Sequence, residues 1–393
     1  MNKRILIFAH NTIGLGHYMR CAAIAKEINK IMPDASVLLL TGLHYGEHVN
    51  VPPGLEIMRL PAYETVIKDD KWVMEPHKLK MNKEEFIELR KGIILNLVQN
   101  YKPDIFLVDK TAVGSYKELL PSIEYLKTQL PNSKLILGLR GALDEPEKTI
   151  EKFKKNDVYN ILEKYYDYIL AYCEKEVFDL TKLLNFSEKI NKKLIYVGFV
   201  INKKDDELKN KSEIRAATKS KNKKLIVVSA GGGIDGFKIL ETALKSTKKL
   251  KLPNIKLLVF TGPFIPEKKF KILKRFENQS ITVEKHTPLL IDLINAANLV
   301  IAMGGNNTIS EILSTNTPAI IIPRVFPERE QLFVSQRLSE LGYIFFIHPN
   351  SLNDKILAKT IKEIFEGKIN FKKRNLRTDG AIRTAKFINN LLK

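Results

Sequence analysis

His17 is the side chain of this sequence whose type and setting best suit proton transfer. It follows a strand-like apolar run at residues 5–9 and a turn containing Gly14 and Gly16, where we expect a helix to begin. A neutral imidazole titrates close to neutral pH and can accept the proton of a hydroxyl group. The first turn of a helix also presents unpaired N–H groups, which suit an anionic or hydroxyl-bearing ligand. An ordinary helix cap would use the same two glycines, so the turn alone leaves both interpretations open.

Three further side chains stand where chemistry could use them. Arg20 lies one helical turn beyond His17 and shares its face, so it could hold an acidic group of a substrate or pair with a neighbouring acid. Asp109 and Arg140 each follow a strand-like run, at the strand end where site residues gather in α/β proteins. Turns and caps also use Asp at such positions, so a structural role for Asp109 is the alternative.

A second glycine-rich turn follows a later strand-like run. Gly231, Gly233 and Gly236 match the G-x-G-x-x-G spacing of dinucleotide-binding folds. Those folds also place an acidic residue at the end of the next strand, whereas Thr261 and Gly262 stand there in this chain. We therefore expect this turn to cradle a diphosphate through its backbone N–H groups, without a nicotinamide dinucleotide.

A third turn, within residues 303–313, leads from a strand into a helix through two glycines, two asparagines and a threonine. Thr308 and Glu311 have the spacing of a capping box, which explains the glutamate on structural grounds alone. In the competing interpretation, the Glu311 carboxylate accepts hydrogen bonds from the two hydroxyls of a ribose. A polar loop at 323–331 follows the next strand and brings more polar side chains to the same sheet edge.

Apolar runs of strand length alternate with amphipathic helical stretches along the chain. This alternation predicts an α/β fold with mostly parallel sheets and helices on both faces. A polar, lysine-rich stretch interrupts the series. We expect two doubly wound, Rossmann-like domains facing across a cleft, at 1–200 and 223–370, joined by a linker at 201–222 and followed by a helix within 371–393 that packs back on the first domain. The expected strands are residues 5–9, 36–40, 104–108, 134–139, 168–171, 194–197, 225–228, 256–260, 281–283, 299–302, 319–322 and 344–347.

Composition limits the class of partner and the compartment. The 393 residues include 64 Lys and Arg against 44 Asp and Glu, for a formal net charge of +20. Acidic residues are interleaved with the basic ones and no Arg-rich block occurs, so we expect no nucleic-acid partner. The charge fits either attraction to nucleotide diphosphates and acidic lipid headgroups or a compositional bias. No apolar run approaches the ~20 residues that span a bilayer, and the two cysteines are far apart, so we expect a cytoplasmic protein.

Several segments carry a family resemblance. GGNNTISEILSTNTPAIIIPR and EREQLFVSQRLSELG resemble the donor-binding half of GT-B glycosyltransferases of the MurG type, the family 28 C-terminal domain type. FAHNTIGLGHYMRCAAIAKEI is similar to the N-terminal motif of a group of uncharacterised bacterial predicted glycosyltransferases related to them. LGLRGALDEPE and YILAYCEKEVFD resemble intermediate segments of the same group. The resemblance covers the chain from end to end and implies the GT-B fold.

The resemblance also implies roles for the candidate residues. His17 would be the catalytic base near the acceptor, the 231–233 turn would hold the donor diphosphate, and Glu311 would bind the ribose. The implied donor-side residues are Gly231, Gly232, Gly233, His286, Thr287, Gly304, Gly305, Asn306, Asn307, Thr308, Glu311, Arg324, Glu330 and Gln331. The acceptor-side residues are His10, Asn11, Gly14, Gly16, Arg20, Asp109 and Arg140.

The implied activity is that of a metal-independent inverting glycosyltransferase. It would move a sugar from a nucleotide-diphosphate sugar, with a UDP-sugar favoured, to a hydroxyl acceptor. GT-B enzymes typically stabilise the departing diphosphate with helix dipoles and basic groups, and Asp69 with Asp70 is not a convincing metal-binding pair, so we expect no metal and no other cofactor. The turn GLGHYMRC also resembles that of the UDP-sugar hydrolase of the pseudaminic acid pathway. A hydrolase or epimerase on the same fold, and a non-catalytic nucleotide-sugar-binding protein, are therefore the alternatives.

Two departures from the family pattern concern the acceptor. Tyr18 stands where a proline commonly follows the glycine-histidine turn, and Gly141 follows Arg140 where relatives often have Asp. We therefore expect a different mode of acceptor recognition. MurG-like enzymes meet lipid-linked acceptors at the inner face of the membrane. The segment 68–86, with the single tryptophan Trp72, is a candidate acceptor loop or peripheral membrane contact, and an ordinary surface loop is the alternative.

Overall fold

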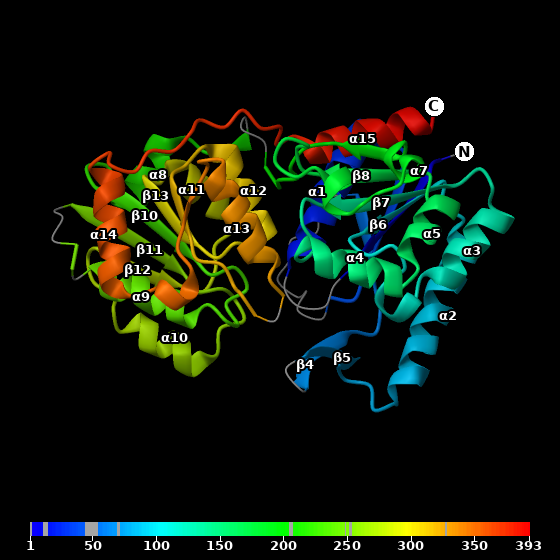
Figure 1. The fold of residues 1–393 in the computed structure, drawn as a ribbon, viewed down its shortest axis with the longest axis horizontal. Helices are drawn as coiled ribbons and strands as arrows, with labels where there is room; N and C mark the ends of the chain where they lie inside the picture. Colours follow the sequence, from blue (N-terminus) through cyan, green and yellow to red (C-terminus); the bar gives the residue numbers. More distant parts are fainter. Residues whose placement is uncertain are drawn as a thin grey trace. The chain divides into compact units, whose positions relative to one another are not determined.

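The computed structural model describes residues 2–10, 15–43, 54–68, 71–203, 207–247, 249–250, 254–326 and 328–393. The chain forms two compact units (Figure 1). Unit 1 comprises Met1–Asn202 and Asp379–Lys393, and unit 2 comprises Lys203–Thr378. The division between them falls inside the segment 201–222, which also contains a helix, α8 (Lys211–Ala217).

In the described part of unit 1, a seven-stranded parallel sheet has the order β3-β2-β1-β6-β7-β8-β9. The central strands are continuous apolar runs, as expected where helices cover both faces of a parallel sheet. The order reverses between β1 and β6, which makes this the switch point where α/β folds bind ligands. The strands are β1 (Arg4–Ala9), β2 (Ser36–Thr41), β3 (Leu55–Arg59), β6 (Ile105–Asp109), β7 (Lys134–Arg140), β8 (Tyr168–Tyr172) and β9 (Leu194–Tyr196).

The helices of unit 1 bury apolar stripes against this sheet. The C-terminal helix α15 packs on α1, and its Ala385 and Ile388 share one core with Ile24 and Ile28 of α1. Figure 1 shows α15 beside α1. The helices are α1 (Gly16–Ile31), α2 (Lys83–Tyr101), η1 (Ser115–Lys117), α3 (Leu120–Gln129), α4 (Pro146–Lys155), α5 (Val158–Lys164), α6 (Leu180–Leu183), α7 (Glu188–Asn191) and α15 (Gly380–Leu391).

An antiparallel hairpin of β4 (Tyr63–Lys68) and β5 (Lys71–Pro76) stands beside α2, apart from the large sheet (Figure 1). The expectation of a loop within 68–86 was therefore wrong for residues 71–76, because β5 pairs with β4. The hairpin is anchored by Tyr63, whose ring packs against Phe86 at 5.0 Å.

In the described part of unit 2, a six-stranded parallel sheet has the order β12-β11-β10-β13-β14-β15. Its switch point lies between β10 and β13, whose carboxyl ends lead into the second and third glycine-rich turns. The strands are β10 (Lys224–Ser229), β11 (Ile255–Phe260), β12 (Ile281–Glu284), β13 (Leu299–Ala302), β14 (Ala319–Ile321) and β15 (Phe345–Phe346). The remaining helices are α9 (Phe237–Thr247), α10 (Glu267–Lys274), α11 (Leu290–Ala296), α12 (Asn306–Thr315), α13 (Glu330–Glu340), η3 (Pro349–Ser351) and α14 (Asp354–Phe365).

The predicted α/β class with parallel sheets is confirmed, and each of the twelve expected strands is present. Strands β3, β4 and β5 were missed. Across the described ranges, none of the helices combines the length and apolar character needed to cross a bilayer.

The start of α15 depends on a glycine with no room for a side chain. A Cβ at Gly380 would lie 2.4 Å from the Gly198 carbonyl oxygen. We expect Gly380→Ala to lower the free energy of unfolding by about 1–3 kcal/mol, because backbone must move to admit the methyl group. Gly92 in α2 is the matched control, since a Cβ there meets nothing within 4 Å. Gly92→Ala should raise stability by about 0.5–1 kcal/mol in the same urea titration. Equal effects of the two substitutions would contradict the proposed packing of α15.

Candidate functional site

The carboxylate of Asp109, at the end of β6, joins two side chains of the first turns of α1. Arg20 donates from Nε to Oδ1 at 2.9 Å and from Nη2 to Oδ2 at 3.0 Å. His17 bonds to Oδ2 through Nδ1. Asp109 is 1% exposed and Arg20 is 3% exposed. The three side chains meet because β1, which feeds α1, is paired with β6 at the switch point. The two-point guanidinium–carboxylate geometry fixes both groups.

The charges in this cluster determine which nitrogen of His17 carries the proton. Burial by itself would raise the pKa of Asp109, but Arg20 and His17 outweigh it and hold that pKa well below its ordinary value. Nδ1 of His17 faces both the Asp109 carboxylate, which only accepts hydrogen bonds, and Nη2 of Arg20 at 2.9 Å, which only donates. The contact with the carboxylate is the shorter of the two, so we assign the proton to Nδ1, and Nε2 keeps its lone pair. Burial lowers the pKa of His17 to about 3, against the opposing effect of Asp109, so the ring is neutral at physiological pH. A neutral imidazole oriented in this way has the form of a general base.

A second histidine stands next to the first. The rings of His10 and His17 are 5.8 Å apart and nearly perpendicular. Thr111 and His10 share a hydrogen bond of 3.1 Å between Oγ1 and Nδ1. Burial is the main cause that lowers the pKa of His10 well below its ordinary value, with the charge of Lys110 the next. Thr111 and Lys110 were missed from the sequence, although they directly follow Asp109 at the strand end.

The structure places the residues that were predicted to bind the acceptor in different settings. Arg20 and Asp109 are buried in a mutual ion pair, so the structure favours a positioning role over the predicted direct contact with an acceptor. Arg140 ends β7, the neighbour of β6, and is 8% exposed. Gly16 is the first residue of α1. His10 lies beside His17, as described above. The predicted residues Asn11 and Gly14 lie outside the described residues.

Gly141, a departure from the family pattern, has a packing explanation. A Cβ at this position would lie 2.3 Å from the ring of Phe178. Glycine, and not the aspartate often found in relatives, therefore follows Arg140 because the ring of Phe178 leaves no room for a side chain at position 141. Larger residues do not fit there unless Phe178 moves.

The second glycine-rich turn, 230–236, packs backbone to backbone against the loop after β11. Gly231 and Gly233 have φ values of 59° and 92°, which favour glycine. A Cβ at Gly233 would lie 2.2 Å from the carbonyl oxygen of Thr261, whereas one at Gly231 would meet nothing within 4 Å. Gly232 accepts a hydrogen bond of 2.9 Å from the backbone of Phe264. Gly233 is thus required by packing, and Gly231 is the position with open space for a ligand.

The third turn differs from the sequence interpretation. Helix α12 begins at Asn306 with Gly305 as its N-cap and no side-chain cap. Thr308 and Glu311 therefore lie inside the helix, and the predicted capping box was wrong. The extended backbone of Gly305, at φ −63° and ψ 136°, starts the helix before Thr308 can serve as the cap. Gly304 instead permits close packing on α13, since its Cβ would lie 2.9 Å from Ser335 Oγ.

The capping box therefore does not explain why a glutamate stands at position 311. Burial raises the pKa of its carboxyl group to about 7. Among the residues that the structure describes, nothing donates a hydrogen bond to this carboxylate. A partly buried acceptor of this kind is suited to a pair of ligand hydroxyls.

The remaining donor-side residues lie in loops at the same carboxyl edge. The backbone N–H of Arg324 donates to Gln331 Oε1 at 3.0 Å, and its guanidinium lies 3.5 Å from Asp235. Glu330, the first residue of α13, is buried. Thr287 Oγ1 accepts from the Leu289 N–H at 3.1 Å, which ties this hydroxyl to the start of α11. The residues not yet placed, His286, Asn306 and Asn307, lie in the loop after β12 and at the start of α12.

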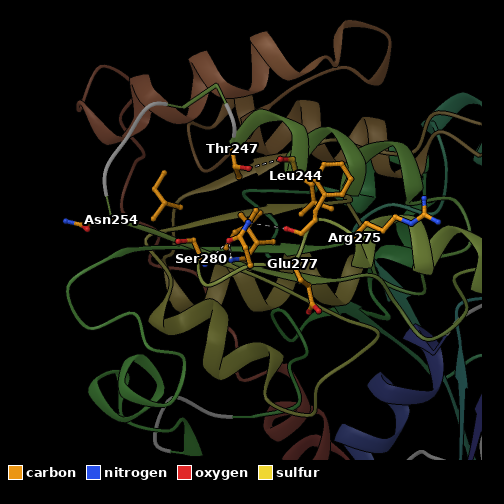
Figure 2. A pocket seen from close by; sticks show the side chains of 11 residues that line it. Leu244, Thr247, Asn254, Arg275, Glu277 and Ser280 are labelled. Atoms are coloured by element: carbon orange, nitrogen blue, oxygen red, sulfur yellow. Dashed lines mark hydrogen bonds between the residues drawn. The ribbon is translucent and has the colours of Figure 1, made fainter.

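A separate pocket of about 610 Å³ lies at the other edge of the unit 2 sheet (Figure 2). It is bounded by the end of α9, the amino end of β11 and the loop before β12, with Thr247, Asn254 and Ser280 among its lining residues. Because the strands are parallel, this edge is opposite the glycine-rich turns. The predicted donor residues do not line it.

Comparison with known proteins agrees with this architecture. Residues 226–388 match the glycosyltransferase family 28 C-terminal domain. An uncharacterized glycosyltransferase of Methanosarcina mazei is 24% identical over 379 residues, which cover 93% of this chain and 90% of the relative. The UDP-N-acetylglucosamine–N-acetylmuramyl-(pentapeptide) pyrophosphoryl-undecaprenol N-acetylglucosamine transferase of Alkaliphilus metalliredigens is 25% identical over 349 residues, 86% of this chain and 84% of the relative. The crystal structure of Acinetobacter baumannii MurG superposes with a TM-score of 0.62 over 99% of both chains, at 11% identity.

The two doubly wound units define the fold class as GT-B. Residues 226–388 thus match a family 28 C-terminal domain, and the chain is similar along most of its length to MurG-type and uncharacterized glycosyltransferases.

The neutral state of His17 has a measurable effect on stability. Its pKa of about 3 in the folded chain lies below the roughly 6.5 of an unfolded histidine, so the unfolded chain gains a proton first as pH falls. This contribution is fully present above pH 6.5 and is lost as pH falls toward 3. Loss of this contribution should lower the free energy of unfolding by about 2 kcal/mol between pH 7.5 and pH 5, as measured by urea denaturation. In His17→Gln, the free energy of unfolding should change less steeply with pH over the same range. The same slope in both proteins would contradict a neutral His17.

Proposed function

We propose that this protein is a metal-independent, inverting glycosyltransferase that uses a nucleotide-diphosphate sugar, with a UDP-sugar favoured. The observation that carries the proposal is the orientation of His17 by Asp109, which leaves Nε2 available as a base at the switch point of unit 1. In this proposal unit 2 holds the donor and His17 activates the hydroxyl of the acceptor. The GT-B fold and the family 28 domain support the division of roles.

The donor half of the proposal relies on backbone groups. The turns at 230–236 and 303–305 precede the N-termini of α9 and α12, where N–H groups and the positive ends of the helix dipoles favour a diphosphate. The two turns follow β10 and β13, which are adjacent strands. Glu311 binds the ribose diol on the second turn of α12. This arrangement stabilises the charge of the leaving diphosphate without requiring a metal ion.

In the proposed reaction, the acceptor hydroxyl displaces the nucleoside diphosphate in a single step. Nε2 of His17 takes the proton of the acceptor hydroxyl as its oxygen forms a bond to the anomeric carbon. The bond between that carbon and the diphosphate oxygen breaks, and the nucleoside diphosphate leaves with the electron pair. Asp109 stabilises the imidazolium that forms. One displacement inverts the anomeric centre.

A nucleotide-sugar panel tests the proposal. Each donor is incubated with hydroxyl acceptors, with and without EDTA, and nucleotide release is measured. We expect release that requires both a donor and an acceptor and that EDTA does not reduce. Release without any acceptor would identify a hydrolase instead, and donor binding without turnover would identify a non-catalytic binding protein.

The acceptor in this proposal is a hydroxyl compound, and a lipid-linked one is the first class to include. The Alkaliphilus relative, by its name, acts on a pyrophosphoryl-undecaprenol acceptor. Peripheral contact with the inner face of the membrane belongs to the same proposal. Sedimentation with anionic vesicles tests it, and absence of co-sedimentation would favour a water-soluble acceptor.

Glu311 supplies a pH-dependent prediction. Only its ionised form can accept from both ribose hydroxyls, so we expect nucleotide affinity to fall by about tenfold per pH unit well below the pKa of about 7. Glu311→Gln should weaken binding at pH 8 and remove this pH dependence in calorimetric titrations.

The raised pKa of Glu311 also has a consequence for stability. It means that the folded chain favours the protonated carboxyl group, whose stabilising contribution is lost as pH rises through 7. Glu311→Gln should therefore not lower stability at pH 8. A loss of stability with unchanged nucleotide affinity would indicate a purely structural role instead.

A further inference from the structure

An ion pair bridges two loops at the carboxyl edge of unit 2. Asp235 belongs to the turn before α9, and Arg324 belongs to the loop between β14 and α13. Arg324 Nη1 lies 3.5 Å from Asp235 Oδ2, and the side chains are 28% and 41% exposed. The hydrogen bond from the Arg324 backbone to Gln331 Oε1 holds the loop that carries the guanidinium. The pair therefore lies beside the turn containing Gly231, the glycine with open space around it.

The interaction is of a kind that a ligand can replace. A solvent-exposed ion pair with one long contact contributes little free energy, about 0–1 kcal/mol. A diphosphate offers several charged oxygens, and two of them can accept parallel N–H bonds from one guanidinium. Arg324 can therefore exchange a weak partner for a stronger one.

We propose that Asp235 competes with the nucleoside diphosphate for Arg324 and so promotes release of this product after sugar transfer. The inference rests on the proposed function, because it assumes that the diphosphate binds at the 230–236 turn. When the product is bound, Arg324 contacts the diphosphate and Asp235 loses its partner. When the product leaves, the ion pair forms again. Asp235 thereby limits affinity for the diphosphate and keeps the leaving nucleotide from blocking the site.

A structural role for Asp235 makes a different prediction. An acidic residue just before a helix interacts favourably with the helix dipole, and α9 begins two residues after Asp235. If this were its only role, Asp235→Asn would lower stability and leave nucleotide affinity unchanged.

Calorimetric titration of the full chain with UDP and with uridine tests the competition. We expect Asp235→Asn to bind UDP about two- to fivefold more tightly, because the competing carboxylate is removed. Affinity for uridine, which lacks the diphosphate, should not change. The matched control is Glu241→Gln, which removes an acid of α9 that pairs with Lys245 at 2.8 Å away from the turn. It should bind UDP as the unmodified chain does.

A double-mutant cycle with Arg324→Gln identifies the partner. The tightening by Asp235→Asn should disappear when Arg324 is replaced, and the same tightening in that background would overturn the inference in favour of simple charge repulsion. If the unmodified chain binds UDP and Asp235→Asn binds it no more tightly, the inference is wrong and the proposed donor site stands. If the unmodified chain binds none of UDP, GDP, CDP and dTDP, the proposed donor site itself is wrong.

Discussion

The buried carboxylate of Asp109 is the group on which the arrangement of unit 1 depends. It is ionised because Arg20 and His17 surround it, and it compensates the charge of a guanidinium that is itself almost inaccessible to water. Removing one partner of such a pair leaves a buried charge uncompensated, which costs about 3–5 kcal/mol. The same contact fixes the ring of His17. Stability and the orientation of the His17 ring therefore rest on one interaction, and α15 supports it from outside by packing on α1.

The two units reverse their strand order in the same way but place different groups at the point of reversal. In each sheet the strand order reverses at a central pair, β1 with β6 and β10 with β13, and the loops after those strands converge. Unit 1 fills this point with charged and imidazole side chains. Unit 2 fills it with glycines and helix N-termini, so that backbone N–H groups are the main donors there. This difference suits a base on one unit and a diphosphate site on the other.

The sequence was sufficient to predict the parallel sheets, because fully buried strands are continuous apolar runs. It did not reveal the hairpin of β4 and β5, whose alternating apolar and polar residues lie among lysines and resemble a loop. The T-x-x-E spacing at Thr308 was misleading, since the backbone of Gly305 decides where α12 begins. The Arg20–Asp109 contact joins residues 89 apart in sequence, so either partner alone was compatible with several roles. Likewise, the requirement for glycine at 233 comes from Thr261, on a different loop.

In the proposed mechanism, donor binding belongs to unit 2 and proton transfer belongs to His17 of unit 1. The most direct measurement compares nucleotide affinity with the rate of sugar transfer in His17→Ala, using the donor that supports turnover. We expect the rate to fall by about 10²–10⁴-fold, while the Kd for the nucleoside diphosphate stays within about twofold of that of the unmodified chain. Retained transfer, or loss of nucleotide binding in parallel with the rate, would contradict it.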